Sequence, residues 1–283
     1  MKYGLVMEGG AMRGIFTAGV TDVLMENGIE FDDSVGVSAG ACFGCNYKSK
    51  QNGRVIRYNL RFCKNKSYCS WHSLITTGDI FGAEFCYHTI PEKLDPFDNE
   101  AFESNKMEFY VVATDINTGK AVYHNCRIAT GDTLEWIRAS ASMPLAARIV
   151  NIDGREFLDG GISDSIPLRF MESIGYDKNI VIVTQPRGFV KTPSRSASLV
   201  KMRYRKYPEL VKAYERRPKM YNEQLRYIEA SEAAGRAFVI APPEKLPIGH
   251  TEHDPDKILE VYRTGRKAAA SQLEAIKEFM RCD

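Results

Sequence analysis

Residues 35–41, which read VGVSAGA, constrain the fold of this chain more than any other stretch of its sequence. A short apolar run precedes Ser38, and an apolar helical pattern follows it. Gly36 and Gly40 flank the serine at the spacing G-x-S-x-G, and glycines there relieve crowding at a sharp strand-to-helix turn. The pattern predicts a serine hydroxyl exposed on that turn. A serine nucleophile also needs a base, and no histidine lies near it in the sequence.

Strand and helix patterns alternate along the first half of the chain. Alternation of this kind predicts an α/β fold, with a mostly parallel central sheet and helices on both of its faces. The chain of 283 residues is long enough to bury a substantial core. Strands are expected at residues 3–7, 34–37, 108–114, 120–124, 155–158, 179–184 and 237–241, and helices at 12–26, 38–49, 130–142 and 255–280.

Two regions differ in composition. Residues 1–185 carry the alternation, and residues 186–283 are expected to form a helical C-terminal region with one further strand. Residues 187–219 hold eleven Lys or Arg and two acidic residues, a local charge of +9 in a chain with a net charge of +2. Because a strand pattern returns after this basic segment, the C-terminal region is expected to be continuous with the core.

A glycine-rich turn follows the first strand, at residues 8–14 (EGGAMRG). It is not a P-loop, because Ile15 and Phe16 stand where Lys and Ser or Thr would grip phosphate and magnesium. It also lacks the G-x-G-x-x-G spacing of dinucleotide sites. Two interpretations remain: a plain strand-to-helix turn, or a set of outward backbone N–H groups that would stabilise an oxyanion.

Two kinds of residue are candidates for the base of Ser38. His250 and His253 lie late in the chain, where α/β-hydrolases carry their histidine, although surface histidines are the more common case. Asp159 ends a strand pattern and precedes two glycines, so its carboxylate is expected at the edge of the sheet. An ordinary Asp-Gly turn is the alternative for this motif. The residue patterns leave these alternatives open.

Several classes of protein are disfavoured by composition. No apolar stretch of signal-peptide length opens the chain, and no run of 18 apolar residues occurs, so the cytoplasm is the expected compartment. The seven cysteines are irregularly spaced. Cys42 and Cys45 form a C-x-x-C without a second pair, which favours small buried helix residues over a zinc or redox site. No metal or cofactor is expected.

The three motifs, in this order and spacing, resemble the patatin-like phospholipase family, and bacterial members especially. The resemblance extends from Gly4 to about Thr184 and implies a three-layer α/β/α patatin-like fold. It further implies a Ser–Asp dyad, in which Ser38 is the nucleophile and Asp159 is its base. No histidine is required in such a dyad.

The resemblance also assigns roles around the dyad. Gly9, Gly10 and Ala11 match the oxyanion loop of the family, and Arg13 matches the basic residue of that loop. Residues 139–144 (ASASMP) are similar to a helix that ends in proline and packs beneath the active site.

Two residues depart from the family pattern. Glu8 stands where Asp or Gly is usual, and Ala11 replaces a third glycine. Alanine still donates an N–H group but adopts positive φ only at a cost. Asp115, in a segment that also resembles the family, is expected to be a structural turn residue and not a catalytic one.

The resemblance favours a serine acyl-ester hydrolase of the phospholipase A type, acting on a lipid or another acyl ester. A small-ester hydrolase or thioesterase with the same dyad is one alternative. A non-catalytic lipid-binding or regulatory protein that keeps the fold is another. No nucleic-acid partner is expected, because no base-reading motif accompanies the basic segment. The sequence predicts no oligomeric state.

The basic segment at 187–219 allows two interpretations. Tyr204, Tyr207, Tyr214 and Tyr221 recur among its Lys and Arg residues, as in a helix that makes peripheral contact with an anionic membrane. The alternative is a solvated helical face whose tyrosines pack inward. Pro208 and Pro218 are expected to break any long amphipathic helix, which favours the second interpretation.

Overall fold

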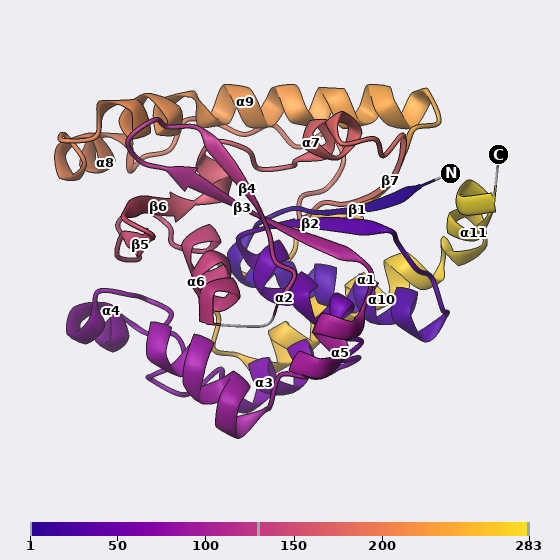
Figure 1. The fold of residues 1–283 in the computed structure, drawn as a ribbon, viewed down its shortest axis with the longest axis horizontal. Helices are drawn as coiled ribbons and strands as arrows, with labels where there is room; N and C mark the ends of the chain where they lie inside the picture. The colour runs from indigo at the N-terminus through magenta and orange to yellow at the C-terminus, as the bar shows by residue number, and fades with distance from the viewer. Residues whose placement is uncertain (1, 129–130, 282–283) are drawn as a thin grey trace.

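The computed structural model describes residues 2–128 and 131–281. Within these residues eight strands form one mixed sheet in the order β5-β6-β3-β2-β1-β7-β8, with β4 beside β3 (Figure 1). The strands are β1 (Tyr3–Met7), β2 (Asp33–Val37), β3 (Glu108–Asp115), β4 (Ala121–Asn125), β5 (Val150–Ile152), β6 (Arg155–Asp159), β7 (Lys178–Ile182) and β8 (Ala237–Ile240).

Helices cover both faces of the sheet, so the three-layer α/β/α arrangement expected from the sequence is confirmed (Figure 1). One layer consists of α7 (Leu168–Ser173), α8 (Ala197–Arg203) and α9 (Pro208–Ala233). The other contains α1 (Gly14–Glu26), α2 (Ala39–Lys48), α3 (Arg54–Phe62), α5 (Asn99–Ser104), α6 (Gly131–Ser140) and α10 (Pro255–Ala270). The remaining helices are η1 (Ala11–Arg13), α4 (Trp71–Thr77), the π-helix η2 (Phe85–Leu94), η3 (Gly160–Ile162) and α11 (Leu273–Arg281).

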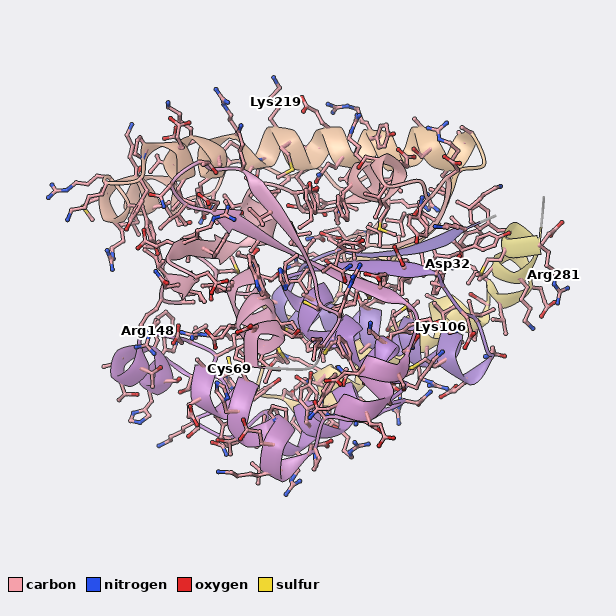
Figure 2. All side chains as sticks on the ribbon, in the orientation of Figure 1. Asp32, Cys69, Lys106, Arg148, Lys219 and Arg281 are labelled. Carbon is pink, nitrogen blue, oxygen red and sulfur yellow. The ribbon has the colours of Figure 1, made fainter. Side chains whose placement is uncertain are left out.

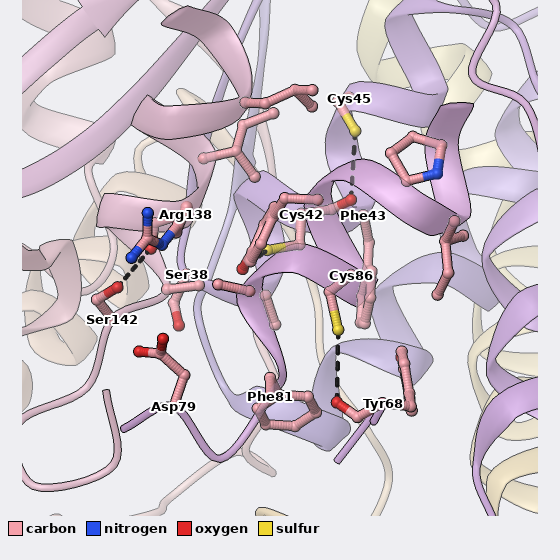
Figure 3. Close-up of a pocket in the computed structure, with 18 of the residues that line it drawn as sticks. Ser38, Cys42, Phe43, Cys45, Tyr68, Asp79, Phe81, Cys86, Arg138 and Ser142 are labelled. Atoms are coloured by element: carbon pink, nitrogen blue, oxygen red, sulfur yellow. Dashed lines mark hydrogen bonds between the residues drawn. The ribbon is translucent and has the colours of Figure 1, made fainter. Parts of the chain in front are cut away.

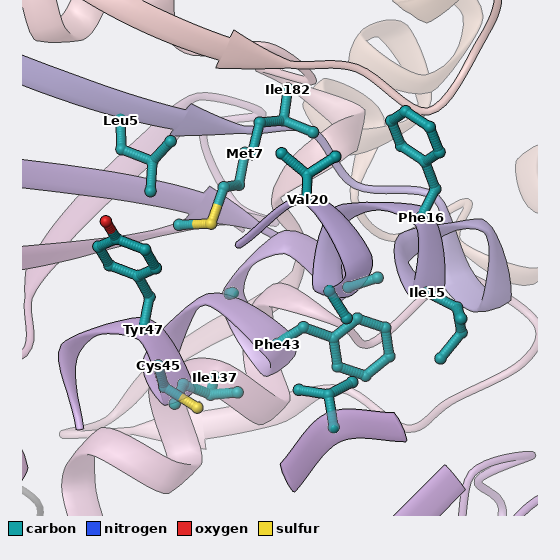
Figure 4. Close-up of a cluster of buried hydrophobic side chains, with 14 of the residues drawn as sticks. Leu5, Met7, Ile15, Phe16, Val20, Phe43, Cys45, Tyr47, Ile137 and Ile182 are labelled. Atoms are coloured by element: carbon teal, nitrogen blue, oxygen red, sulfur yellow. The ribbon is translucent and has the colours of Figure 1, made fainter. Parts of the chain in front are cut away.

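The parallel part of the sheet is buried on both faces. Strands β3, β2, β1, β7 and β8 are parallel to one another, whereas β4, β5 and β6 pair antiparallel. In β1, Leu5 and Met7 point toward α1 and α2 (Figure 4), and Val6 points into the opposite core beneath α9. This alternation with a period of two is why an unbroken apolar run is needed in a central strand.

Strand β3 sets the relative positions of β2 and β6. Val112 pairs with Val37 at the end of β2, and the next residue, Ala113, pairs with Asp159 at the end of β6. Strand β4 occupies the other edge of β3 along both positions. The ends of β2 and β6 therefore meet on the same edge of β3, although they are far apart in the sequence.

The C-terminal helices differ from expectation in two places. Helix α9 runs without interruption from Pro208 to Ala233, so the prediction that Pro208 and Pro218 would break it is wrong. Pro208 lies in the first turn, where no N–H is needed, and Pro218 costs one backbone hydrogen bond that the packing of α9 on the core tolerates. The single helix expected at 255–280 is two helices, α10 and α11.

The tyrosines of the basic segment pack inward, as the second interpretation expected. Tyr204, Tyr214 and Tyr221 are buried in the cores beneath α8 and α9. Helix α6 begins at Gly131; Thr130, the expected first residue, lies outside the described residues. Between residues 50 and 107 the sequence patterns predict only a loop and helix start at residues 95–100, and α5 begins there at Asn99. They do not predict α3, α4 and η2.

Helix α10 joins the C-terminal region to the first helix of the chain. A Cβ atom added to Gly19 in α1 would lie 2.2 Å from the carbonyl oxygen of Tyr262, and one added to Gly265 would lie 2.1 Å from that of Phe16. The two helices therefore touch through their backbones, a contact that only glycine allows. Across the described ranges, no helix is both long and apolar enough to cross a membrane.

Candidate active site

Ser38 lies at the carboxyl end of β2, on the turn into α2. Its backbone has φ 55° and ψ −121°, a conformation that costs energy in any residue other than glycine. A Cβ on Gly36 would lie 2.5 Å from the carbonyl oxygen of Gly40, and one on Gly40 would lie 2.4 Å from that of Met7. The two elbow glycines thus let α2 pack directly on the ends of β1 and β2. The Ser38 N–H donates to Ser140 Oγ at 2.8 Å, which fixes the turn against the end of α6.

Asp159 accepts a hydrogen bond from Ser38, with 2.7 Å between Oγ and Oδ2. Its other oxygen, Oδ1, accepts from the Gly161 N–H at 2.8 Å. Its backbone is held on both sides: the N–H donates to the Ser142 carbonyl at 2.9 Å, and Thr114 Oγ1 donates to its carbonyl at 2.8 Å. The segment 139–144 thus supports both members of this pair.

The environment of Asp159 makes its carboxylate a stronger base. Burial raises the pKa of this carboxyl, and the Arg217 guanidinium and the Ser38 hydroxyl oppose part of that rise. A raised pKa brings the group closer to neutral pH, where a general base is most effective.

The glycine-rich turn lies next to Ser38 at the carboxyl end of β1. A Cβ on Gly9 would lie 2.8 Å from Ser38 Cβ, so only glycine fits there. Within the described part of the chain, the N–H groups of Gly9, Gly10 and Ala11 have no hydrogen-bond partner. Ala11 has φ 49°, so the residue that replaces the third glycine still adopts the left-handed conformation. Arg13 follows two residues later, and its Nε is buried without a hydrogen-bond partner among the described residues.

Glu8, the other departure from the family pattern, is a buried tether. Its carboxylate accepts the Thr184 N–H at 2.6 Å and the Tyr221 hydroxyl at 2.7 Å. Thr184 lies just beyond β7, and Tyr221 lies on α9. The glutamate therefore fixes the base of the glycine-rich turn to both neighbouring elements.

A large apolar cavity opens at Ser38 on the side of α2 and α6 (Figure 3). Its volume is about 720 Å³, within the range of roughly 300–1,000 Å³ that is usual for ligand pockets. Cys42, Phe43, Phe81 and Cys86 line it, together with other apolar side chains from α2, η2 and α6. We call this space the apolar cavity.

A second, small space adjoins Ser38 on the side of α9. Its volume is about 50 Å³. It is lined by the glycine-rich turn, Asp159, Glu8 and Tyr221, and by the cations Arg13, Lys191 and Arg217. We call it the cationic pocket. Ala11, Ser38, Met143 and His250 line both spaces, so Ser38 lies at their junction.

The histidines considered as bases occupy different positions. His250 lines both spaces but has no hydrogen bond to Ser38. The Ser38 hydroxyl donates its hydrogen bond to Asp159. Partial desolvation lowers the pKa of His250, and Arg13, Arg217 and Lys191 lower it further. His253 is bound elsewhere, with Nδ1 2.7 Å from the Cys63 carbonyl.

Three further residues behave as structural parts. Asp115 holds the turn after β3 by accepting from the Asn117 and Thr118 N–H groups, both at 3.0 Å.

Burial raises the pKa of Cys42 and of Cys45 to about 12, so both are protonated, weakly reactive thiols. Within residues 2–128 and 131–281, no group of three or more His, Cys, Asp or Glu side chains is placed to hold a metal ion.

Sequence patterns missed Lys191 and Arg217 as members of the site. Both belong to the basic segment, where many cations are equivalent in sequence. The packing of α9 on the sheet places these two cations beside Ser38, and no local sequence motif marks them. A serine on a strand-to-helix turn of an α/β sheet, opening into an apolar cavity, is the setting of the carboxylic-ester hydrolases.

Comparison with known proteins agrees with this class. The model of the Patatin-like phospholipase family matches residues 5–171, and residues 207–281 match a family described only as a domain of unknown function. The chain belongs to the patatin-like phospholipase family and is a carboxylic-ester hydrolase by class.

Similar proteins include an uncharacterized protein of Escherichia coli, YjjU, which is 29% identical over 256 residues, covering 87% of this chain and 70% of YjjU. Lysophospholipase NTE1 of Chaetomium globosum is 29% identical over 188 residues. That match covers 62% of this chain but only 11% of the lysophospholipase. VipD from Legionella pneumophila is a similar solved structure, with a TM-score of 0.47 and 14% identity over 97% of this chain and 67% of VipD.

Proposed function

We propose that this protein is a lipid acyl hydrolase of the phospholipase A or lysophospholipase type, with Ser38 as nucleophile and Asp159 as its base. The hydrogen bond of 2.7 Å from Ser38 Oγ to Asp159 Oδ2 carries the proposal. The raised pKa of Asp159 supports it, because a carboxylate with an ordinary pKa would be a weak base at neutral pH.

The reaction proceeds in two halves. Ser38 Oγ attacks the ester carbonyl carbon and transfers its proton to Asp159. When the tetrahedral intermediate collapses, the carbon–oxygen bond to the alcohol breaks, and the alcohol leaves with the proton from Asp159. A water molecule then gives a proton to Asp159 and attacks the acyl group on Ser38. The carboxylic acid leaves, and the proton returns to Ser38.

The glycine-rich turn supplies the oxyanion donors. The N–H groups of Gly9, Gly10 and Ala11 are free of other partners within the described part of the chain and lie beside Ser38. Donors fixed before the reaction stabilise the tetrahedral oxyanion more than mobile donors do. The positive φ of Ala11 supports the same assignment, because strain of this kind persists where the surrounding structure holds it in place.

The apolar cavity favours a lipid substrate over a small ester. At about 720 Å³ it has room for a long acyl chain, and a small acyl group would leave most of its apolar lining without contacts. The small-ester hydrolase or thioesterase and the non-catalytic protein remain the competing functions. Activity on esters of increasing acyl-chain length distinguishes a lipid hydrolase from a small-ester hydrolase or thioesterase. Labelling of Ser38 by a serine-reactive probe distinguishes an enzyme from a non-catalytic protein.

The first experiment is labelling with a fluorophosphonate probe, read by intact mass. We expect one adduct on the wild-type protein, none on Ser38→Ala, and labelling slowed by roughly 10²–10⁴-fold in Asp159→Asn. Ser34→Ala, a serine on the same strand, is the control and should label normally. If His250→Gln labels more slowly than Asp159→Asn, the base is His250 and the dyad is wrong. If the wild type does not label, the non-catalytic function gains support.

We further propose that the side of the molecule bearing α4 and α8 contacts an anionic membrane; both helices lie at the left end of Figure 1. Trp71 and Ile75 on α4 are 72% and 83% exposed, and Leu199 and Met202 on α8 are 53% and 68% exposed. Leu199 and Met202 lie among lysine and arginine residues in the sequence, such as Lys201 and Arg203. Binding to vesicles should rise with their phosphatidylglycerol content and fall in Trp71→Ser and Leu199→Ser. Equal binding by all variants would exclude this surface.

We also propose that residues 186–283 are continuous with the core. Strand β8 pairs with β7 in the same sheet, and α10 touches α1 through Gly19 and Gly265. Lys191 and Arg217 also reach the candidate site from this region.

A further inference from the structure

We infer that Arg217 on α9 is a positioning residue for Asp159, so that the C-terminal region completes the candidate active site. The inference rests on the proposed function, in which Asp159 is the base of Ser38. Arg217 acts on Asp159 through the backbone of Gly161. A nucleophile and its base are commonly supported by a third group that orients the base, and Arg217 takes that part here.

The backbone of Gly161 connects the two side chains. Its N–H donates to Asp159 Oδ1 at 2.8 Å, and its carbonyl accepts the Arg217 Nε–H at 2.7 Å. A Cβ atom added to Gly161 would lie 3.0 Å from Asp159 Oδ1 and 3.3 Å from a terminal nitrogen of Arg217. The carboxylate and the guanidinium therefore converge on one glycine, which has no side chain to separate them.

The direction of the Gly161 N–H depends on what holds the rest of its turn. Helix η3 has only three residues, Gly160–Ile162, so few hydrogen bonds of its own fix it. The Gly161 carbonyl also accepts from Ser165 Oγ at 2.7 Å, but Ser165 follows in the same loop. Arg217 is the donor that comes from another element, and it anchors the turn to α9.

Arg217 lies on a face of α9 that is itself fixed to the site. Tyr221 and Gln224 follow four and seven residues later, so they share that face. Tyr221 donates to Glu8 at 2.7 Å, and the Gln224 side-chain oxygen accepts the N–H groups of residues 165–166 at 3.2 and 3.1 Å. The position of the guanidinium is thus determined by a packed helix and not by a loop.

The charge of Arg217 acts on the same carboxylate. Burial raises the pKa of Asp159, and the Arg217 guanidinium opposes that rise more than any other group does. Within the ranges that the structure describes, Arg217 forms no ion pair, and the oxygens of Asp159 accept from Ser38 and Gly161. A direct ion pair would hold the carboxylate ionised more firmly and make it a weaker base. A cation on the far side of Gly161 keeps Asp159 ionised and still able to accept a proton.

Other titratable or charged groups also face Asp159. They are Cys42 on α2, Glu8 and Arg13 at the glycine-rich turn, Lys191 after β7, Tyr221 on α9 and His250 before α10. Lys191 also lowers the pKa of Asp159, but it is the weakest of the groups that do so, and it makes no contact with Gly161. Arg217 is the cation that has both the contact and the larger influence.

The test is the pH profile of kcat/KM for 1-octanoylglycerol, used below its micellar concentration. This ester is uncharged, so the loss of a cation does not change its attraction to the protein. In Arg217→Gln the acid-side midpoint should move up by about one pH unit, because Asp159 loses the cation that favours its ionised form. The rate on the plateau above the midpoint should fall roughly tenfold, because the base is less well aligned. A merely structural role would lower the rate at every pH without moving the midpoint.

The conservative variant Arg217→Lys separates the two contributions. It keeps the charge but lacks the planar fork of donors. The midpoint should return to within about 0.3 pH units of the wild type, while the plateau rate stays reduced. Kinetics equal to the wild type in both Arg217→Gln and Arg217→Lys would overturn the inference.

The matched control is Lys219→Gln. This lysine lies on α9 two residues beyond Arg217, but its side chain is 82% exposed and points outward at the top of the molecule (Figure 2). The substitution removes a positive charge from the same helix, and neither the midpoint nor the plateau should change. An equal shift of the midpoint in Lys219→Gln would also overturn the inference, because any charge on α9 would then have the same effect.

The pKa of Asp159 can also be measured without hydrolysis. The carboxyl signal is followed by NMR against pH in protein labelled with carbon-13 aspartate, and Asp159→Asn identifies the signal. The pKa should be higher in Arg217→Gln than in the wild type, at a melting temperature that shows both to be folded. If Ser38-dependent hydrolysis is absent but the pKa differs, the proposed function fails and the positioning role stands. If the wild type hydrolyses the ester and the two pKa values are equal, the positioning role fails and the proposed function stands.

Arg217→Lys decides the case if Arg217→Gln does not fold. Its plateau rate should be lower than that of the wild type at an almost unchanged midpoint. A plateau equal to that of the wild type would then show that the contact with Gly161 does not position the base.

Discussion

The two spaces that meet at Ser38 differ in every property that decides what they bind. The apolar cavity is about 720 Å³ and is lined by Phe, Tyr, Cys and Ile side chains from α2, η2 and α6. The cationic pocket is about 50 Å³ and is lined by charged groups from the glycine-rich turn, the end of β6, the segment after β7 and α9. Under the proposed function, the acyl chain would bind on the apolar side and the alcohol would leave on the cationic side. Ser38 lies at the boundary between them, and Asp159 is hydrogen-bonded to it from the cationic side.

The largest expected effect comes from a change at the boundary, which should act on both sides equally. Asp159→Asn keeps the shape of the side chain but removes the base, so kcat/KM should fall by roughly 10²–10⁴-fold for charged and uncharged esters alike. Steady-state kinetics with 1-octanoylglycerol and 1-octanoylglycerol 3-phosphate measures kcat/KM for an uncharged and a charged ester. In the wild type, kcat/KM should also fall as the pH drops through the raised pKa of Asp159, above the range of an ordinary carboxyl.

The control for this prediction is Ser34→Ala on the same strand. A loss confined to one of the two esters in Asp159→Asn would contradict a shared base, because a base serves every substrate that Ser38 attacks.

The next effect should be confined to the apolar cavity. Cys86 lines this cavity (Figure 3), and Cys86→Phe fills part of it with a ring. The activity on hexadecanoyl esters should fall about tenfold more than the activity on octanoyl esters, because the longer chain needs the lost space. A chain-length series from four to sixteen carbons measures the shift. Ala270→Phe, on the exposed surface of α10, is the control; a uniform loss at all lengths would mean that the acyl chain does not use this cavity.

A third effect should be confined to the cationic pocket and should depend on pH. Lys191, with a pKa lowered to about 8 by burial and by Arg217, is charged below that pH and loses its proton above it. The ratio of kcat/KM for 1-octanoylglycerol 3-phosphate to kcat/KM for 1-octanoylglycerol should therefore decrease, by up to about tenfold, between pH 7 and pH 9.5. The ratio of kcat/KM for the two esters at each pH is the measurement.

Lys191 is the group expected to titrate in this window. The guanidinium groups of Arg13 and Arg217 face the same pocket. Desolvation lowers the pKa of His250, and burial raises that of Tyr221. The carboxylates of Glu8 and Asp159 also face the pocket. A ratio that stays constant with pH, or that changes equally in Lys191→Gln, would show that the lysine does not contact the phosphate.

The smallest effect concerns stability. Tyr221→Phe removes the hydroxyl that donates to Glu8 and leaves a buried carboxylate oxygen with one partner fewer. The free energy of unfolding should decrease by about 1–3 kcal/mol, as measured in urea. The chain-length profile, which belongs to the apolar cavity, should not change. An unchanged stability would mean that Glu8 does not tie the glycine-rich turn to α9.

The sequence predicted the parts of the site that depend on local structure. The turn at Ser38 follows from two glycines between a strand and a helix, and the position of Asp159 at the end of β6 follows from the strand pattern and the two glycines after it. These motifs determine the backbone over a few residues, so they can be recognised without the fold. The family resemblance added the pairing of the two ends, which the structure places together on one edge of β3.

The parts that depend on packing could not be predicted. Pro218 indicated a broken helix, but burial of Tyr214 and Tyr221 holds α9 straight across it. Ala11 adopts a conformation that its side chain disfavours, because the neighbouring turn is fixed at Glu8 and Ser38. The choice of Lys191 and Arg217 among many cations depends on where α9 crosses the sheet, which is a property of the whole molecule.

The tether from Glu8 to Tyr221 has a consequence for the order in which the protein becomes functional during synthesis. Ser38 and Asp159 leave the ribosome before α9 does, and nascent chains generally fold from the N-terminus. The hydroxyl that anchors the glycine-rich turn arrives only with Tyr221, shortly after Lys191 and Arg217, which line the cationic pocket. A partly synthesised chain would thus carry Ser38 and Asp159 before the glycine-rich turn is anchored, so the final geometry of that turn depends on the last third of the chain.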